Sequence, residues 1–261
     1  MASTARTRPA ADPTTAPSAY VAEFVGTLLL VFAIGAVASS NSQGGLGFVD
    51  FVSIALVHAF ALTVLVASFG RFSGGHFNPA VTIALLAIKK IKSADAIVYI
   101  IAQLLGAVAA AGLLALAFTK DIGTIANFGA AGVTKELASG KDGIGGGFVF
   151  EMIGVFILVT TIVATAVAPG GDRRFAPLAI GLSLGLANFI AAPFTGGALN
   201  PARAFGPALI SNSFGETLVF IVVYIVAPIV GALLAALLYN GLLGPDKDRE
   251  VAPSTTLSEE N

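Results

Sequence analysis

The chain has 261 residues, of which 56% are hydrophobic and 11% are charged, and its formal net charge at pH 7 is −1. Soluble domains carry about 25% charged residues, so this composition indicates a membrane protein, and a charge near zero gives nucleic acid nothing to bind. With no cysteine and two histidines, the sequence predicts no disulfide, no metal site and no cofactor.

Six apolar runs are each long enough to cross a bilayer, which requires about 20 residues. They lie between two polar ends, residues 1–18 and 244–261, which we expect to be disordered tails. The runs cover residues 19–38, 49–69, 95–118, 147–168, 176–195 and 217–240. The sequence therefore predicts an all-α membrane protein with one membrane domain at residues 19–243.

Two short segments outside these runs begin with the same tripeptide. The tripeptides are Asn78, Pro79 and Ala80, and Asn200, Pro201 and Ala202. Asn is a good N-cap and Pro fits the first helical position, so each tripeptide predicts a helix start. The apolar residues that follow, 81–88 and 204–210, are too few to span a membrane. We predict two re-entrant half-helices that enter the bilayer and stop.

Landmarks of the first half of the chain recur in the second half at nearly constant spacing. They are Glu23 and Glu151 (128 residues apart), the two tripeptides (122 apart), and Tyr99 and Tyr224 (125 apart). One unit of three spans is thus used twice, at residues 19–118 and 147–243, with a connecting loop at 119–146. Because three is odd, the second copy must be inverted in the membrane.

The positive charges fix an orientation. With both termini in the cytoplasm, ten Lys and Arg residues lie on the inner side and three on the outer side, which agrees with the positive-inside rule. The inner set is Arg6, Arg8, Arg71, Lys89, Lys90, Lys92, Arg173, Arg174, Lys247 and Arg249, and the outer set is Lys120, Lys135 and Lys141. We expect an integral protein of the cell membrane, plasma or inner, with both termini cytoplasmic.

Two half-helices that enter from opposite faces should meet near the middle of the membrane. Irregular backbone is tolerated there where it is buried in protein or lines water. Each helix N-terminus carries roughly half a positive charge, which disfavours protons and other cations. Asn78 and Asn200 can cap these termini with their oxygens while their amide groups donate to a passing solute oxygen. The pattern predicts a pore for neutral molecules.

Both tripeptides, the paired Glu landmarks and Arg203 directly after the second tripeptide resemble the aquaporin (major intrinsic protein) family over about residues 19–239. The resemblance implies a homotetrameric passive water channel. It also implies exclusion of protons and ions, which is the known behaviour of aquaporin-type pores. Family members have a selectivity filter outward of the tripeptides, and the matching positions here are His58, Asn188, Gly197 and Arg203.

The filter positions depart from those of water-selective members, which resemble one another in having Phe first and His second. His58 instead resembles plant vacuolar-type members, and Asn188 is smaller than the expected His. We expect a wider and more hydrophilic opening that conducts water and extends to ammonia, hydrogen peroxide, urea and glycerol. Ala204 stands where glycerol-conducting members resemble one another in having Asp.

Several buried residues have an expected structural role. Four polar side chains should support the pore loops, because re-entrant backbone has incomplete hydrogen-bond ladders. They are Glu23, Glu151, His76 and Gln103. Four glycines should allow close helix crossings, namely Gly26, Gly106, Gly154 and Gly231.

Three alternatives remain open at this stage. A proton-coupled secondary transporter also uses inverted repeats, and Glu23 or Glu151 would then be its titrating acid. An enzyme needs a nucleophile–base pair or a metal cluster, which the sequence does not offer. A structural membrane protein would have a closed lumen. The expected partners are water, small neutral solutes, the lipid bilayer and further copies of the chain.

Overall fold

The computed structural model describes residues 16–43, 50–118, 126–134, 137 and 143–243. All regular elements within these ranges are helices. The tails expected at both ends fall almost wholly outside the described residues. Pro17 and Ser18, placed in the N-terminal tail by composition, already belong to the first helix. Proline at a helix start loses no hydrogen bond, which explains why the helix begins there.

Six described helices are long and apolar enough to cross a membrane, as the sequence predicted. The first three are α1 (Pro17–Gln43), α2 (Phe51–Ser73) and α4 (Ser93–Ala117). The others are α6 (Ile144–Ile162) continued by the π-helical η4 (Val163–Val167), α7 (Ala176–Thr195), and the succession α9 (Thr217–Val219), η5 (Phe220–Val226), α10 (Ala227–Leu238) and η6 (Tyr239–Leu243). The chain is therefore an integral membrane protein.

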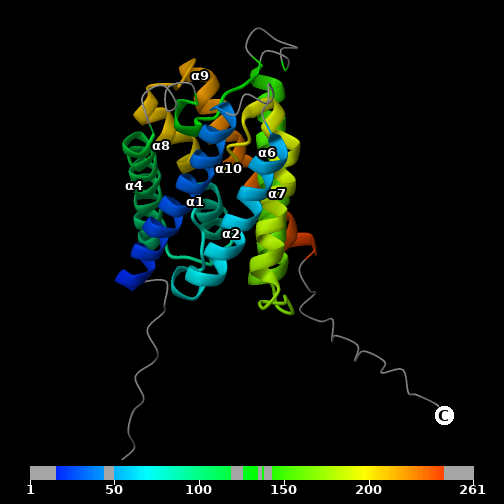
Figure 1. Ribbon diagram of the computed structural model, residues 1–261. Coiled ribbons are helices and arrows are strands. Elements are labelled where there is room, and N and C mark those ends of the chain that lie inside the picture. The colour runs from blue at the N-terminus through cyan, green and yellow to red at the C-terminus, as the bar shows by residue number, and fades with distance from the viewer. Residues whose placement is uncertain (1–15, 44–49, 119–125, 135–136, 138–142, 244–261) are drawn as a thin grey trace, which may run out of the picture.

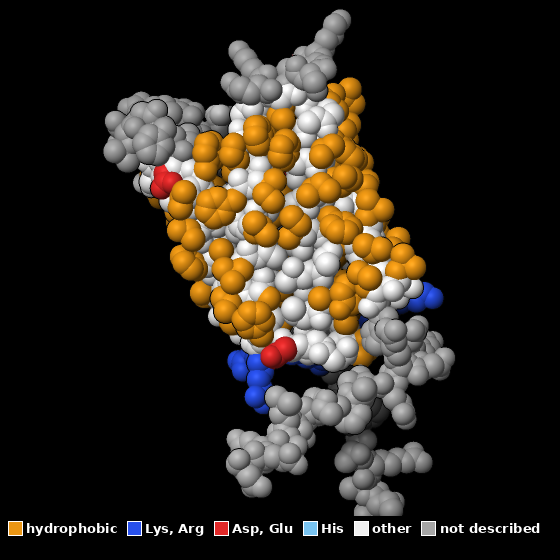
Figure 2. Space-filling model, turned by 90° about the vertical axis from the view of Figure 1, so that its right-hand side faces the viewer, with side chains coloured by type: hydrophobic (Ala, Val, Ile, Leu, Met, Phe, Trp, Pro, Cys, Tyr) orange, Lys and Arg blue, Asp and Glu red, His pale blue; other side chains and the backbone are white. Residues whose placement is uncertain are grey.

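The outer surface of the bundle matches a lipid environment. Apolar side chains form a broad belt on the flank shown in Figure 2, and the visible Lys and Arg side chains lie toward its lower end. Large apolar residues such as Leu105, Leu186 and Leu234 are half exposed on different helices. Exposed apolar surface of this extent is stable only in contact with lipid or another apolar surface.

Helix α2 ends later than its hydropathy suggested, at Ser73 instead of residue 69. Hydropathy falls at Gly70 and Arg71, but neither residue stops a helix by its backbone. The helix stops where Gly74 adopts a left-handed conformation (φ 86°) and its N–H bonds the carbonyl of Gly70. A local backbone geometry, rather than polarity, sets this boundary.

The two half-helices are α3 (Pro79–Ala87) and α8 (Pro201–Ser211). Each packs on the last span of the opposite half, α3 against α10 and α8 against α4. The halves also repeat their own pairing, because α1 packs on α4 as α6 packs on α10. This exchange of half-helices joins the two inverted repeats into one bundle, in which α2 and α7 lie side by side (Figure 1).

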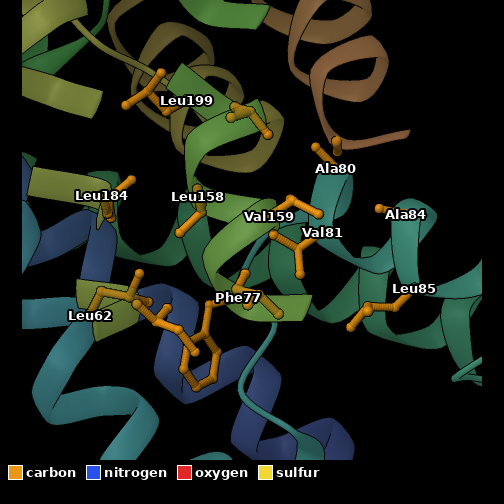
Figure 3. Close-up of a cluster of buried hydrophobic side chains, with 14 of the residues drawn as sticks. Leu62, Phe77, Ala80, Val81, Ala84, Leu85, Leu158, Val159, Leu184 and Leu199 are labelled. Carbon is orange, nitrogen blue, oxygen red and sulfur yellow. The ribbon is translucent and has the colours of Figure 1, made fainter. Parts of the chain in front are cut away.

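The largest buried apolar cluster surrounds the segments that lead into the half-helices. Figure 3 shows Phe77 and Leu199 within it, together with Leu158 of α6 and Val81 of α3. Phe77 and Leu199 are both completely buried. These two side chains, one from each repeat, pack between the spanning helices and so fix the position of the loops.

The four glycines that the sequence singled out serve two different purposes in the fold. Gly106 and Gly231 lie at helix crossings, as predicted, because a Cβ there would meet the carbonyl oxygens of Phe24 and Met152. Gly26 and Gly154 were expected to do the same. Their nearest neighbours are instead the side chains of Phe77 and Leu199, so these glycines make room for the loops. Loop side chains cannot be located from helix periodicity, which explains the difference.

Substitution of Gly106 by Ala tests the close crossing of α1 and α4. The new Cβ would lie 2.4 Å from the carbonyl oxygen of Phe24, so the helices must separate. We expect a loss of about 1–3 kcal/mol in stability, measured as a lower midpoint of thermal unfolding in detergent. Gly112→Ala on the same helix is the matched control, because nothing lies within 4 Å of its Cβ. Equal midpoints for both variants would contradict this packing.

Candidate functional site

The two half-helices begin with equivalent caps. Asn78 has extended backbone angles (φ −155°, ψ 120°), and its Oδ1 accepts a hydrogen bond of 2.9 Å from the N–H of Ala80. Asn200 is also extended (φ −162°, ψ 114°), and its Oδ1 accepts from the N–H groups of Ala202 (2.9 Å) and Arg203 (3.3 Å). Each Asn thus satisfies donors that a helix start leaves unpaired.

The same two side chains bond across the junction. Asn78 Nδ2 donates to the carbonyl of Leu199 at 2.9 Å, and Asn200 Nδ2 donates to the carbonyl of Phe77 at 2.8 Å. Sequence reasoning predicted the caps but missed these bonds, because nothing in a tripeptide reports which backbone it faces. Each amide group carries two hydrogens, so one remains for the cavity that both residues line.

Two residues in the loops have left-handed backbone angles, Phe77 (φ 48°) and Leu199 (φ 53°). This conformation is uncommon for residues other than glycine, so the surrounding structure must hold it. It turns the carbonyls of both residues toward the opposite Asn. The bonds across the junction therefore depend on whatever fixes these two loops.

Buried Glu23 fixes the first loop. Its carboxylate accepts from the N–H groups of His76 (2.9 Å) and Phe77 (2.7 Å) and from Ser73 Oγ (2.6 Å). A fourth bond comes from Gln103 Nε2 at 2.7 Å. The side chain has no exposed surface, and four donors compensate its burial.

Buried Glu151 fixes the second loop in the same way. Its carboxylate accepts from the N–H groups of Ala198 (2.9 Å) and Leu199 (2.6 Å) and from Thr195 Oγ1 (2.7 Å). The expected structural role of both acids agrees with these contacts. Ser73 and Thr195, which are 122 residues apart, were not singled out from the sequence although they share the spacing of the tripeptides.

Gln103 and His76 brace only the first half. Gln103 Nε2 donates to Thr82 Oγ1 at 3.0 Å, and His76 Nδ1 lies 3.1 Å from the same oxygen.

The two tyrosine landmarks bind the ends of the neighbouring helices. Tyr99 Oη donates to the carbonyl of Ser73 at 3.0 Å, and Tyr224 Oη donates to that of Thr195 at 2.8 Å.

A narrow cavity runs along the junction of the half-helices. Its volume is about 20 Å³, enough for roughly one water molecule at a time. Asn78, Asn200, His58 and Arg203 line it, and most of the other lining side chains are apolar. A few polar groups on an apolar wall can orient a small solute without holding it.

A wider vestibule of about 550 Å³ adjoins the narrow cavity on one side. The two share His76, Val81 and Ile180 in their walls. Lys90 and Arg173 stand on the vestibule wall, so this side is the one that carries the cluster of positive residues. The charge count had placed both residues on the cytoplasmic side.

The four residues expected to form a filter lie near one another, but they differ in what they contact. His58 and Arg203 line the cavity, and both are almost completely buried. Asn188 stands behind them, where its Nδ2 lies 3.0 Å from the carbonyl of Gly197 and 3.3 Å from His58 Nε2. Arg203 Nε and Nη1 are buried and have no hydrogen-bond partner among the described residues.

Six spanning helices in inverted repeats, with two half-helices meeting at a polar cavity, define an aquaporin-like fold. The family model described as major intrinsic protein matches residues 12–239. Aquaporin TIP2-1 of Arabidopsis thaliana is 43% identical over 230 residues, which cover 86% of this chain and 86% of that protein. The chain belongs to the major intrinsic protein family.

Two further comparisons widen the picture. The glycerol uptake facilitator protein-like 6 of Lactiplantibacillus plantarum is 40% identical over 217 residues, covering 83% of this chain and 94% of that protein. The X-ray structure of the aquaglyceroporin from Plasmodium falciparum has the same fold, with a TM-score of 0.71 at 24% identity, and the match covers 87% of this chain and 96% of that one.

Substitution of Glu151 by Gln tests the support of the second loop. The amide nitrogen of Gln would face one of the loop donors, so at least one buried N–H would lose its acceptor. We expect a loss of about 1–3 kcal/mol in stability, visible as a lower midpoint of thermal unfolding. Glu216→Gln removes the same charge at an exposed position and serves as the control. The role is refuted if Glu151→Gln unfolds at the wild-type temperature.

Proposed function

We propose that this protein is a passive membrane channel for water and small neutral solutes. The observation that carries the proposal is the meeting of two half-helix N-termini at Asn78 and Asn200, which line one narrow cavity. The relatives named aquaporin and glycerol uptake facilitator support the same conclusion. Conduction follows from donors that bind a solute oxygen briefly and then release it to the next site.

Protons and other cations are excluded by charge at the same junction. Each half-helix brings a partial positive charge of roughly half a unit to the cavity, and a cation there meets both. Arg203 adds a full positive charge to the cavity wall. A neutral molecule with an oxygen or nitrogen acceptor meets no such barrier. The chain is accordingly a conductor and not an enzyme.

The buried acids support a channel over a proton-coupled transporter. Glu23 accepts four hydrogen bonds and Glu151 accepts three, all from the loops and helices that they hold. Neither residue lines the narrow cavity or the vestibule. A proton taken up by either carboxylate would break the support of the pore instead of driving a solute.

The proposed channel domain covers residues 19–243, with the repeats at 19–118 and 147–243. We place the protein in the plasma or inner membrane, with both termini in the cytoplasm. Lys90 and Arg173 stand at the wide vestibule, and the positive-inside rule assigns that side to the cytoplasm. We further propose a homotetramer, which would cover part of the apolar flank. Native mass spectrometry of the purified protein in detergent tests that state, and a monomer would contradict it.

Stopped-flow light scattering on proteoliposomes tests the function directly. We expect osmotic shrinkage several times faster than in empty liposomes, because water enters an apolar bilayer poorly. Re-swelling in glycerol, urea or ammonia then defines the solute range. An imposed proton gradient should leave every rate unchanged. A rate that follows the gradient would instead favour the transporter.

A cysteine introduced into the cavity tests the conduction path. The wild-type chain has no cysteine, so thiol-directed reagents should leave its water permeability unchanged. Leu184 lines the cavity, and we expect a bulky thiol reagent to block Leu184→Cys almost completely. Leu186, two residues along the same helix, is 53% exposed on the outer surface. Leu186→Cys should keep its permeability after the same treatment, and equal block of both variants would place the path elsewhere.

A further inference from the structure

Asn188 is a buried polar residue that the proposed conduction does not use. It lies on α7 with no exposed surface and is not part of the cavity wall. Its Oδ1 has no hydrogen-bond partner among the described residues. A buried amide oxygen without a partner costs free energy, so the contacts on the other side of the amide group need an explanation.

The amide nitrogen of Asn188 has two neighbours. Nδ2 lies 3.0 Å from the carbonyl oxygen of Gly197 and 3.3 Å from His58 Nε2. A carbonyl only accepts hydrogen bonds, so the NH₂ end must face Gly197, because the reversed amide would oppose two oxygens. The second amide hydrogen then points to His58. The orientation of Asn188 follows from chemistry at Gly197 alone.

The other nitrogen of His58 faces a second carbonyl. His58 Nδ1 lies 2.7 Å from the carbonyl oxygen of Ile54, one turn earlier on α2. This oxygen also only accepts, so Nδ1 must carry the hydrogen. In the neutral ring Nε2 is then an acceptor, which matches the hydrogen offered by Asn188. A proton added at Nε2 would oppose the NH₂ group of Asn188 directly.

We infer that Asn188 is a positioning residue that locks His58 in its neutral, Nδ1-protonated form and withdraws its second nitrogen from the cavity. His58 then shows the cavity only the carbon edge of its ring. Arg203 is then the charged side chain that shares the cavity wall with the apolar edge of His58. The filter has one polar side and one apolar side, which suits small neutral solutes with few hydrogen-bonding groups.

Few titratable groups lie on the helices packed around His58, so few can change the protonation state of its ring. Of the elements packed on α2, the whole of α7 has no titratable side chain, and α1 has Tyr20 and Glu23. Tyr20 donates to Asp95, and Glu23 holds the first loop. Arg203 shares the cavity with His58, and its positive charge also disfavours a protonated ring.

Nitrogen NMR of the protein labelled with ¹⁵N-histidine tests the lock without any transport assay. The chain has two histidines, and the spectrum of His58→Phe identifies the signals of His58 by their loss. We expect a protonated Nδ1 and an unprotonated Nε2 at every pH between about 5 and 8, the range in which a free imidazole titrates. A protonated Nε2, or a titration within this range, would overturn the inference.

Transport measurements test whether the neutral state of His58 keeps water permeability independent of pH. This test rests on the proposed function. Asn188→Leu keeps the branched shape of the side chain and removes its contacts with His58 Nε2 and with the carbonyl of Gly197. We expect its water permeability to change by about twofold or more between roughly pH 5 and 8, whereas the wild type stays flat. Phe189→Leu, at a lipid-facing position of the same helix, should also stay flat, and so should Asn188→Leu combined with His58→Phe.

The two experiments fail in different ways. A pH-independent Asn188→Leu channel whose His58 keeps the wild-type NMR signature would overturn the positioning role. A wild-type protein that does not accelerate water flux would refute the proposed function, and the NMR spectrum would still decide the state of His58. If Asn188→Leu does not fold, the wild-type spectrum alone supports or overturns the lock.

Discussion

Two hydrogen bonds across the middle of the membrane hold the structure of the pore together. Asn78 donates to the carbonyl of Leu199, and Asn200 donates to the carbonyl of Phe77. Lipid is as apolar as the side chains of the half-helices, so the hydrophobic effect does little to hold them end to end, and packing and interhelical hydrogen bonds must do so. The side chains that make these two bonds also cap both helices, and each amide keeps one hydrogen for a solute.

The buried carboxylates explain why this junction can exist at membrane depth. Phe77 and Leu199 have left-handed backbone angles that few residues adopt without support. Glu23 and Glu151 supply that support by accepting the loop N–H groups that no helix satisfies. Both carboxylates thereby serve the structure. Among the described residues that line the narrow cavity, Arg203 carries the charge, and the half-helix N-termini add partial positive charges. This distribution favours passage of neutral molecules.

The repeat is symmetric in its scaffold and asymmetric in its two cavity ends. Positions that lie 122 residues apart correspond, as Ser73 and Thr195 do. By the same spacing His58 corresponds to Ile180, Asn188 to Val66 and Arg203 to Val81, and all three apolar partners line the wide vestibule. At these three pairs of positions the polar side chains therefore lie at one end only, while the other end is wider and carries Lys90 and Arg173 on its wall.

The six spans, the inverted repeat and both half-helix starts could be predicted from the amino-acid sequence, because apolar length and the Asn-Pro order are read directly along the chain. The spacing also singled out Glu23 and Glu151. What these side chains face became clear from the packed structure. The bonds of Asn78 and Asn200 to the opposite loop, the fit of Phe77 against Gly26 and the place of Asn188 behind His58 join residues between 51 and 130 positions apart. Such pairings depend on how α2, α7 and the two loops pack together, and no local pattern encodes them.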